Sequence, residues 1–329
     1  MTALRMGVIG LGMMGRHHVR ILGGLDGVEL VGLHDPLGDP HGVAGGLPVA
    51  STLDEFVELG IDAAVVATPT DDHLKVGLRL AEAGIHALIE KPLAADVGSG
   101  EKLLDAFNAA GLVAAVGHVE RFNPAVRALK ARLRAGELGD LYQVATSRQG
   151  PFPDRIRDVG VIKDLATHDI DLTQFVAGVA FESVSARVAH RAGRPHEDLV
   201  AAVGRLTDGT VTNHLVNWLT PAKERRVTVT GEKGCFVADT LTADLTFYAN
   251  ASVATEWDDI SRFRGVSEGD VVRYAIAKPE PLVVEHIGFR DAVLGRGGEI
   301  VSAADGLAVL RVAAAMSRAA REGTVEEVG

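Results

Sequence analysis

A histidine flanked by two carboxylates is the group in this sequence best suited to proton transfer. In the segment 163–172, Asp164 lies four residues before His168 and Asp171 three residues after it, so all three share one face of a helix. Such carboxylates orient an imidazole as a general base, which removes a hydroxyl proton while hydride leaves the same carbon. Two other interpretations stay open. One is a solvated acidic face with an incidental histidine, and the other is a divalent metal site, although no second histidine stands at ligand spacing.

A glycine-rich turn near the N-terminus has the spacing of a loop that holds a dinucleotide. Gly10 permits a tight turn, Gly12 lets a pyrophosphate approach the backbone, and Gly15 lets helix and strand pack closely. The phosphates then meet the N-terminus of the following helix. A strand before the turn and a helix after it make the motif more specific than its glycines alone. The whole loop is Gly10, Leu11, Gly12, Met13, Met14 and Gly15.

An acidic residue follows the second apolar run at the distance expected for this loop. Asp35 can accept hydrogen bonds from an adenosine ribose, whereas it would repel a 2′-phosphate. No Arg or Lys occurs between Asp35 and Ser51 to bind such a phosphate. The sequence therefore predicts NAD rather than NADP as the cofactor. A competing interpretation makes Asp35-Pro36 an ordinary turn after a strand.

Lys91 is the candidate for holding a substrate oxygen near the cofactor. It follows the apolar run 87–89 and lies between a carboxylate, Glu90, and Pro92, which fixes the local chain. A lysine in this place can hold the substrate hydroxyl and take part in acid/base chemistry beside a positive nicotinamide ring. The alternative is a surface lysine paired with Glu90. Pro92 is a candidate for a preceding cis peptide bond.

Polar residues also follow other strands of the predicted parallel sheet, where ligands bind in such sheets. Thr68-Pro69-Thr70 follows one strand, and His118 leads another into the segment 120–124. Thr70 or Asp71 has a simpler interpretation as a helix cap, and His73 is predicted to be a surface residue of that helix.

Three arginines lie close together in a chain with an acidic balance. Arg148, Arg155 and Arg157 lie within ten residues, in a segment interpreted as a loop. Guanidinium groups suit phosphate oxygens, so this loop is a candidate for binding a diphosphate-bearing substrate. Pairing of Arg155 and Arg157 with Asp154 and Asp158 at the surface is the alternative.

Alternating short apolar and longer amphipathic runs in the first 118 residues predict a doubly wound parallel sheet. A helix is predicted to start at Ser51, with Ser51 and Asp54 as its capping pair, and others to end at Gly84 and Gly111. Pro124 is predicted as the first residue of a basic amphipathic helix that ends near Gly136. The predicted strands are 5–10, 28–34, 63–67, 86–90 and 113–117, and the other helices here are 71–83 and 96–110.

The sequence pattern changes after residue 141, where segments rich in Val and Thr alternate apolar and polar residues with a period of two. Asp208-Gly209 is predicted as a hairpin turn, and the runs predict a mostly antiparallel sheet with helices on one face. The predicted strands are 184–189, 199–206, 210–216 and 226–230, and the predicted helices are 163–177, 282–294 and 302–321.

Length and composition exclude several classes of protein. A chain of 329 residues predicts about two domains. The net charge of −11 disfavours nucleic acid and anionic membrane surfaces as partners. A single cysteine, Cys235, fits a reducing compartment, and no cleavage site follows the apolar run 6–14, so we expect a cytoplasmic protein without a membrane span.

Taken together, these motifs resemble the glucose-fructose oxidoreductase / inositol dehydrogenase / MocA family over nearly the whole chain. The resemblance implies an NAD-binding Rossmann domain at 1–120 and an α+β substrate and oligomerisation domain at 121–329, whose large open sheet is mostly antiparallel. It also implies that the last helix, about 302–321, packs back on the first domain, and that the sheet forms homodimers or homotetramers. The catalytic residues of the family match Lys91, Asp164 and His168. The cofactor-binding residues implied outside the glycine loop are Asp35, Thr68, Pro69, Thr70, His73, Glu90 and Lys91.

The segment 117–124, with the stretch 150–171, is most similar to UDP-N-acetylglucosamine 3-dehydrogenases, which oxidise a sugar C3 hydroxyl with NAD. This similarity implies a nucleotide-sugar substrate, and the lack of a second histidine at ligand spacing leads us to expect no metal. An inositol or free-aldose dehydrogenase is the alternative enzyme, and an NAD-binding sensor without chemistry is the alternative of another class. The implied substrate-binding residues are Lys91, Arg121, Asn123, Arg155, Arg157, Asp164 and His168.

Overall fold

The computed structural model describes residues 3–153, 159–251 and 268–329. The chain divides into two compact units that are not continuous in sequence. Unit 1 comprises residues 1–122 and 279–311, and unit 2 comprises residues 123–278 and 312–329. The last long helix, α9 (Ala303–Glu322), contributes its first half to unit 1 and its second half to unit 2.

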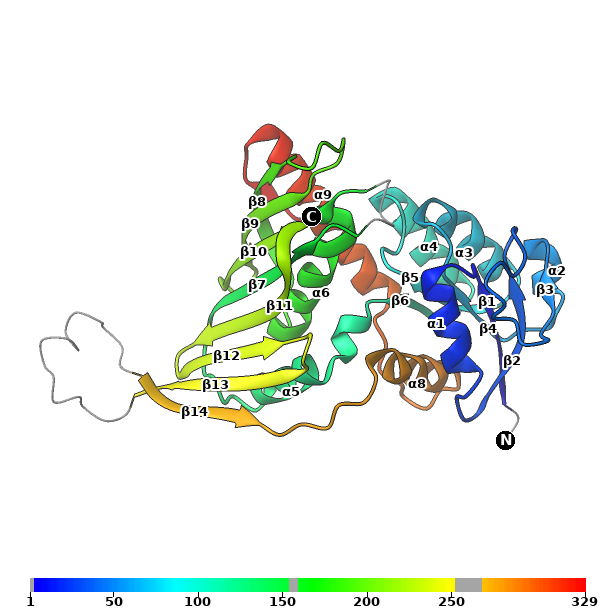
Figure 1. The fold of residues 1–329 in the computed structure, drawn as a ribbon, viewed down its shortest axis with the longest axis horizontal. Helices are drawn as coiled ribbons and strands as arrows, with labels where there is room; N and C mark the ends of the chain where they lie inside the picture. The colour runs from blue at the N-terminus through cyan, green and yellow to red at the C-terminus, as the bar shows by residue number, and fades with distance from the viewer. Residues whose placement is uncertain (1–2, 154–158, 252–267) are drawn as a thin grey trace, which may run out of the picture. The chain divides into compact units, whose positions relative to one another are not determined.

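Unit 1 is built on a six-stranded, fully parallel sheet of order β3-β2-β1-β4-β5-β6 (Figure 1). This is the strand order of the dinucleotide-binding Rossmann fold. Successive strands are added to one side of β1 as far as β3 and then, from β4 on, to its other side. The polar strand ends predicted to bind ligands therefore lie along one edge. The strands are β1 (Leu4–Ile9), β2 (Val28–His34), β3 (Val49–Ala50), β4 (Ala63–Val66), β5 (His86–Glu90) and β6 (Ala114–Gly117).

Helices cover both faces of this sheet, because its strands alternate apolar residues between two cores. One core joins Val66 and Ile89 to the helices α2, α3 and α4 and to the first half of α9. The other joins Val65 and Leu88 to α1 and α8. The helices of unit 1 are α1 (Met13–Leu22), α2 (Leu53–Val57), α3 (His73–Glu82), α4 (Val97–Ala109) and α8 (Pro281–Val293), with 3-10 turns η1 (Thr70–Asp72) and η2 (Val119–Phe122).

The helix ends follow local chemistry, with one correction to the predicted caps. Gly84 and Gly111 adopt left-handed conformations after α3 and α4, as predicted. The α2 cap is Thr52 rather than Ser51, and its hydroxyl accepts the N–H of Glu55 while the Glu55 carboxylate accepts the N–H of Thr52. The pairs Ser51 with Asp54 and Thr52 with Glu55 both have the capping-box spacing. The longer Glu55 side chain reaches back to the cap, whereas Asp54 does not.

Unit 2 is built on a nine-stranded sheet of order β14-β13-β12-β11-β7-β10-β9-β8-β15, in which only the β7/β10 pair is parallel. The predicted Asp208-Gly209 hairpin joins β9 to β10. The strands are β7 (Leu141–Pro151), β8 (Phe181–Ala189), β9 (Leu199–Leu206), β10 (Val211–Asn217), β11 (Leu219–Gly231), β12 (Gly234–Asp239), β13 (Asp244–Asn250), β14 (Glu268–Tyr274) and β15 (Glu326–Glu327).

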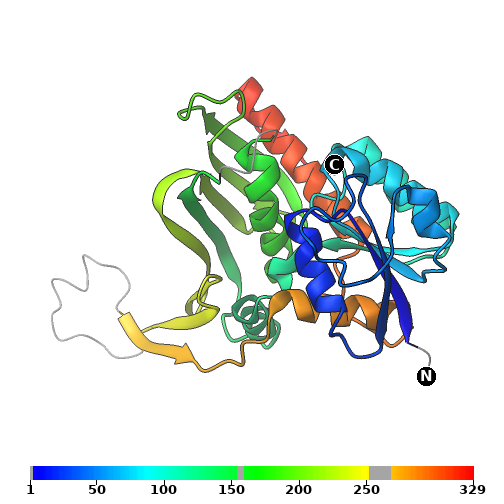
Figure 2. The ribbon, with the colours of Figure 1, turned by 45° about the vertical axis from the view of Figure 1, so that its right-hand side comes forward.

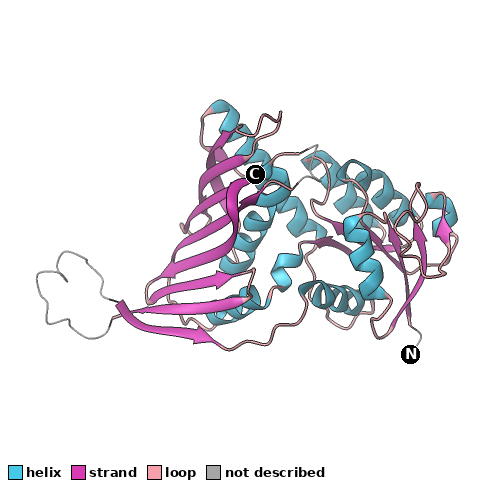
Figure 3. Cartoon of the chain, in the orientation of Figure 1, coloured by secondary structure: helices cyan, strands magenta, loops and turns pink. Residues whose placement is uncertain are grey.

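Two helices of unit 2, α5 (Pro124–Arg134) and α6 (Thr167–Ala177), pack on one face of this sheet (Figure 2). Their buried residues, such as Leu129 and Leu172, meet Val144 and Val229 of the sheet. Figure 3 shows the difference between the units, since helices flank both faces of the six-stranded sheet, whereas the helices drawn for the described part of unit 2 flank one face of the larger sheet. The fold class predicted from the sequence is confirmed.

Candidate active site

The glycine loop has the geometry that each of its three glycines was predicted to serve. Gly10 has a positive φ of 89°, and a Cβ there would lie 2.6 Å from the carbonyl oxygen of Ala67. A Cβ at Gly15 would overlap the carbonyl oxygen of Gly10, whereas one at Gly12 would meet nothing within 4 Å. No side chain caps the N-terminus of α1. The loop therefore offers bare backbone and free helix N–H groups, which fit the pyrophosphate of NAD.

Asp35 holds this loop in place as well as standing where a ribose is expected. Its Oδ2 accepts the N–H of Leu11 at 2.8 Å, and its Oδ1 accepts the N–H of Leu37 at 2.9 Å. Each carboxylate oxygen can accept a second hydrogen bond. The turn interpretation and the ribose interpretation of Asp35 are therefore compatible.

His73 is buried rather than exposed, so its predicted surface position is wrong. His73 is the first residue of α3, and only 1% of its surface is exposed. Its Nδ1 lies 3.0 Å from the carbonyl oxygen of Pro92, and its Nε2 lies 3.1 Å from that of Thr68. Burial lowers the pKa of His73 more than these backbone contacts raise it, so the ring is neutral and donates to one of the two carbonyls at a time. His73 thus braces two strand ends of the predicted cofactor site.

The Glu90-Lys91-Pro92 segment leaves the carboxyl end of β5 in the same sheet. Glu90 is buried, and its carboxylate accepts hydrogen bonds from Nε2 of His18 at 2.9 Å and from the N–H of Lys91 at 3.1 Å. Lys91 is half-buried, and the Lys91–Pro92 peptide bond is cis. A plain surface lysine is therefore a poor description of Lys91.

Burial raises the pKa of Glu90, but the hydrogen bond and charge of His18, the charge of Lys91 and its backbone N–H together hold that pKa below its usual value. Glu90 therefore stays an anion. Farther along the edge, His118 is buried, and Nη1 of Arg121 lies 3.5 Å from Oδ2 of Asp305.

In unit 2, the segment with the predicted general base forms a π-helical turn, η3 (Ile162–Ala166), followed by α6. Asp164 is 7% exposed and Asp171 is fully buried, while His168 is half-buried. Buried carboxylates exclude the solvated acidic face. A π-turn is common at functional sites, because it redirects side chains within a helix.

Arg148 does not belong to a substrate-binding loop, which corrects its predicted role. It lies in the strand β7, where only 3% of its surface is exposed, and its Nε lies 3.1 Å from both carboxylate oxygens of Asp169. An arginine that faces α6 from the sheet is a partner for a buried carboxylate. Arg155 and Arg157 lie outside the described residues.

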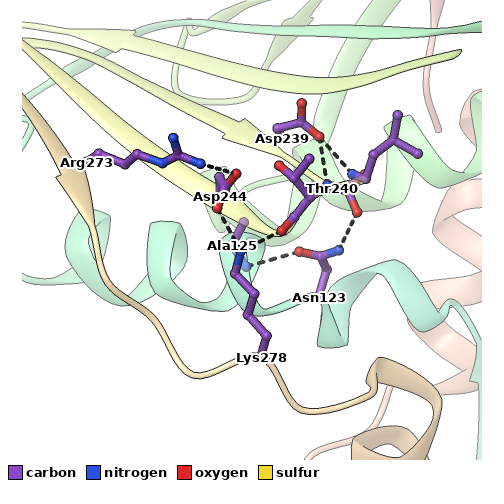
Figure 4. Close-up of polar contacts among 9 residues, drawn as sticks. Asn123, Ala125, Asp239, Thr240, Asp244, Arg273 and Lys278 are labelled. Carbon is purple, nitrogen blue, oxygen red and sulfur yellow. Dashed lines mark hydrogen bonds and ion pairs between the residues drawn. The ribbon is translucent and has the colours of Figure 1, made fainter.

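Asn123 has structural partners within unit 2 (Figure 4). Its Oδ1 accepts the N–H of Ala125 at 3.0 Å and so caps α5, and its Nδ2 donates to the carbonyl oxygen of Thr240 at 2.9 Å. Nearby, hydrogen bonds from Lys278, Thr242 and Arg273 lower the pKa of Asp244 to about 2. Contact between Asn123 and a substrate stays a prediction.

Sequence reasoning did not identify three residues that support these segments. Glu197 accepts the N–H of Ile162 through Oε1 at 3.0 Å and that of Val161 through its carbonyl oxygen at 3.1 Å, so it anchors the start of η3. The other two are His18 and His286, both fully buried in unit 1. Each interrupts an apolar helical stripe with a polar residue, and this interruption was an available signal. Among the described residues, no cluster of three His, Cys, Asp or Glu side chains is placed to hold a metal, and none of their helices could span a membrane.

Comparisons with known proteins agree with this arrangement. Residues 4–118 match the model of the oxidoreductase family with an NAD-binding Rossmann fold, and residues 126–237 match that of the GFO/IDH/MocA C-terminal domain. UDP-N-acetylglucosamine 3-dehydrogenase of Acidithiobacillus ferrooxidans is 32% identical over 70% of this chain and 72% of that protein. The NAD(+)-dependent scyllo-inositol 2-dehydrogenase of Bacillus subtilis is 31% identical over 55% of this chain and 56% of that protein.

Solved structures resemble the whole chain. GnnA, the UDP-N-acetylglucosamine 3-dehydrogenase of Acidithiobacillus ferrooxidans, gives a TM-score of 0.86 at 27% identity over 98% of this chain and 99% of that one. The WlbA dehydrogenase of Bordetella pertussis, in complex with NADH and UDP-GlcNAcA, gives 0.81 at 25% identity over 99% of each chain. The cofactor is NAD and the activity is that of a sugar oxidoreductase, because the chain belongs to the GFO/IDH/MocA family.

Proposed function

We propose that this protein oxidises a secondary hydroxyl of a nucleotide sugar, the C3 hydroxyl of a substrate such as UDP-N-acetylglucosamine, to the ketone. The observation that carries the proposal is the place of Lys91. It leaves the carboxyl end of β5, on the same edge of the sheet as the glycine loop, next to a buried anion. Similarity to the Acidithiobacillus enzyme over 70% of the chain, against 55% for the inositol dehydrogenase, favours the nucleotide sugar.

The residues divide the reaction between them. NAD, when bound, accepts the hydride that leaves the carbinol carbon. His168 accepts the hydroxyl proton, so that the C–O bond becomes a carbonyl as the C–H bond breaks. Lys91 donates a hydrogen bond to the same oxygen and positions it, and Asp164 orients the site. Gly10, Gly12, Gly15 and Asp35 would hold the dinucleotide.

Two substitutions test this assignment. His168→Asn and Lys91→Ala are each expected to lower turnover by about 10²- to 10⁴-fold, because each removes a group that acts on the reacting oxygen. NADH binding, measured by fluorescence titration, is expected to persist in both. Lys102→Ala, at an exposed position of α4, is the matched control. Unchanged turnover in both variants would refute the assignment.

A panel of substrates followed by NADH absorbance separates the candidate functions. Activity on UDP-N-acetylglucosamine without activity on myo-inositol supports the proposal. The reverse result favours an inositol dehydrogenase, which the inositol relatives keep as a second candidate. Dinucleotide binding without redox exchange on any sugar of the panel favours a sensor.

The nucleotide part of the substrate is assigned to Arg155 and Arg157, whose guanidinium groups suit a diphosphate. Arg155→Ala and Arg157→Ala are expected to raise the KM for the UDP-sugar more than they lower kcat. An equal effect on a sugar without the nucleotide would contradict this role.

A second copy of the chain is the partner we propose for the open face of the unit 2 sheet. Val203 of β9 and Val211 and Leu215 of β10 are 56%, 44% and 38% exposed there. Such a row of apolar side chains is typical of an interface. Val203→Lys with Leu215→Lys is expected to shift the mass measured by light scattering toward the monomer. A monomeric wild-type protein would overturn the proposal.

A further inference from the structure

Three buried side chains of unit 1 form a hydrogen-bonded chain that ends one residue before Lys91. Nε2 of His286, in α8, lies 2.8 Å from Nδ1 of His18, in α1. Nε2 of His18 lies 2.9 Å from Oε1 of Glu90, whose Oε2 accepts the backbone N–H of Lys91 at 3.1 Å. Both histidines are fully buried. This chain of hydrogen bonds therefore connects α8, through α1, to the segment that carries Lys91.

The two hydrogen bonds to Glu90 have a defined direction, because an ionised carboxylate can only accept. Burial lowers the pKa of His286 well below its usual value, and the neighbouring His18 lowers it further, so His286 is neutral. His286 and His18 share one hydrogen bond, whose donor depends on the tautomers of the two rings. His18 donates through Nε2 to Glu90, and Lys91 donates through its backbone to the same carboxylate.

The space around Glu90 is shaped for this arrangement. Glu90 pairs with Gly117 across β5 and β6, and a Cβ at Gly117 would lie 3.1 Å from the carboxylate carbon of Glu90. Glycine at this position leaves room for the carboxylate to receive both donors. A buried anion with two fixed donors holds one orientation, and with it the backbone of Lys91.

We propose that His18 and His286 act through Glu90 to position Lys91. The proposal rests on the proposed function, because it presumes that Lys91 contacts the substrate oxygen. One hydrogen bond ties α1, which begins at the dinucleotide loop, to the strand end that carries the lysine. The dinucleotide loop and Lys91 are thereby held in a fixed position relative to each other. A displacement of about 1 Å between them can lower the rate about 100-fold.

A pair of amide substitutions tests the Nε2 contact itself. In His18→Gln the side-chain amide can reach the place of Nε2 and donate to Glu90, whereas in His18→Asn it reaches only as far as Nδ1. We expect kcat to stay within about 3-fold of wild type in His18→Gln and to fall about 30- to 100-fold in His18→Asn. We expect the Kd for NADH to change less than 3-fold in both. Equal kcat in the two variants would overturn the proposal, since a general need for a buried polar group does not distinguish them.

Further variants separate this role from fold stability and from the proposed function. His86→Leu, at the opposite end of β5, removes the acceptor of the Val113 N–H and is expected to lower Tm without lowering kcat.

In a Lys91→Ala background, His18→Asn is expected to cause no further loss of residual turnover, and a full additional loss would overturn the proposal. Glu90→Gln, which keeps the size of the side chain, is expected to lower kcat about 10-fold with Tm nearly kept, and wild-type kcat would refute the role of Glu90. Full turnover in Lys91→Ala itself would instead refute the proposed function.

Discussion

Two buried carboxylates, Asp169 in unit 2 and Glu90 in unit 1, are held in different ways. In unit 2, Asp169 receives Nε of Arg148 on both oxygens, and both side chains are almost fully buried. In unit 1, Glu90 receives an imidazole N–H of His18 on one oxygen and the backbone N–H of Lys91 on the other. The first arrangement is a buried ion pair. The second leaves the charge one residue from a lysine that is a candidate for chemistry.

This difference indicates what each buried charge does. A permanent guanidinium charge that saturates a carboxylate fixes a sheet to a helix and leaves little field for other groups. Glu90 stays an anion beside Lys91, and its negative charge acts on the groups around it. We therefore expect substitutions at the pair in unit 2 to change stability, and substitutions at the chain in unit 1 to change catalysis.

The largest expected effect is on the ion pair of unit 2. Arg148→Met leaves the Asp169 charge buried without its partner and is expected to lower the free energy of unfolding by about 3–5 kcal/mol. The double variant Arg148→Met/Asp169→Leu is expected to recover most of that loss, because it buries no lone charge. Urea denaturation measures both, and turnover per folded molecule should hardly change. A large fall in kcat with unchanged stability would break the comparison.

The pH dependence of stability tests a second buried charged-or-neutral group of unit 2, His214. Burial lowers the pKa of His214, on β10, from 6.5 to about 4, and its Nδ1 lies 2.8 Å from Oγ1 of Thr146. Since the unfolded chain binds this proton and the folded chain does not, stability is full above about pH 6.5 and falls as the pH drops toward 4, by up to about 3 kcal/mol. In His214→Gln the slope between pH 6.5 and 4 should be shallower, as urea midpoints at several pH values would show. Parallel slopes would contradict a neutral His214.

A glycine substitution separates binding from stability within unit 1. Gly12 has an ordinary φ of −66° and nothing within 4 Å of an added Cβ, so Gly12→Ala should keep Tm within about 2 °C. The methyl group would occupy the approach of the pyrophosphate, so we expect the Kd for NADH to rise about 10- to 100-fold, or about 1.4–2.7 kcal/mol. Gly15→Ala is the contrast, because its Cβ overlaps the Gly10 carbonyl oxygen and should lower Tm as well. Unchanged NADH affinity in Gly12→Ala would show that the cofactor lies elsewhere.

The smallest expected effect sets the scale for a polar contact with no link to the site. Thr52→Ala removes half of the capping box of α2 and is expected to cost about 1 kcal/mol of unfolding free energy. Turnover should not change. If Thr52→Ala lowered kcat as much as Glu90→Gln, loss of kcat would report general loosening of unit 1 rather than the role of Glu90.

The sequence predicted unit 1 more fully than unit 2 for a physical reason. Strands such as β2 and β5 were predicted to the residue, since buried parallel strands are continuous apolar runs between helices. The order of elements in a βαβ chain also determines which strands pair. β3 was not predicted, because two residues carry no periodicity.

In unit 2, the sequence predicts a loop for part of strand β7, since this strand carries Gln143, Ser147 and Arg148 and so lacks the apolar alternation that identifies a strand. The strands β12, β13 and β14 were not predicted, and their pairing depends on contacts distant in sequence. For the same reason the predicted role of Arg148 was wrong, because its carboxylate partner belongs to another element. The histidines of the Glu90 chain are 72 and 268 residues from their partners, a separation that no local motif records.

The discontinuity of unit 1 has a consequence for how the protein is made. Residues 279–311 supply Phe289, Leu307 and Leu310 to the two cores that cover the Rossmann sheet, and they supply His286 to the Glu90 chain. A ribosome that has released only the first 122 residues has therefore made a sheet with incomplete cover on both faces. Unit 1 can finish folding only after residues 279–311 have emerged, when all of the unit 2 sheet except β15 has already been made. A fragment cut at residue 122 would expose apolar surface and is a poor choice for expressing the dinucleotide-binding unit alone.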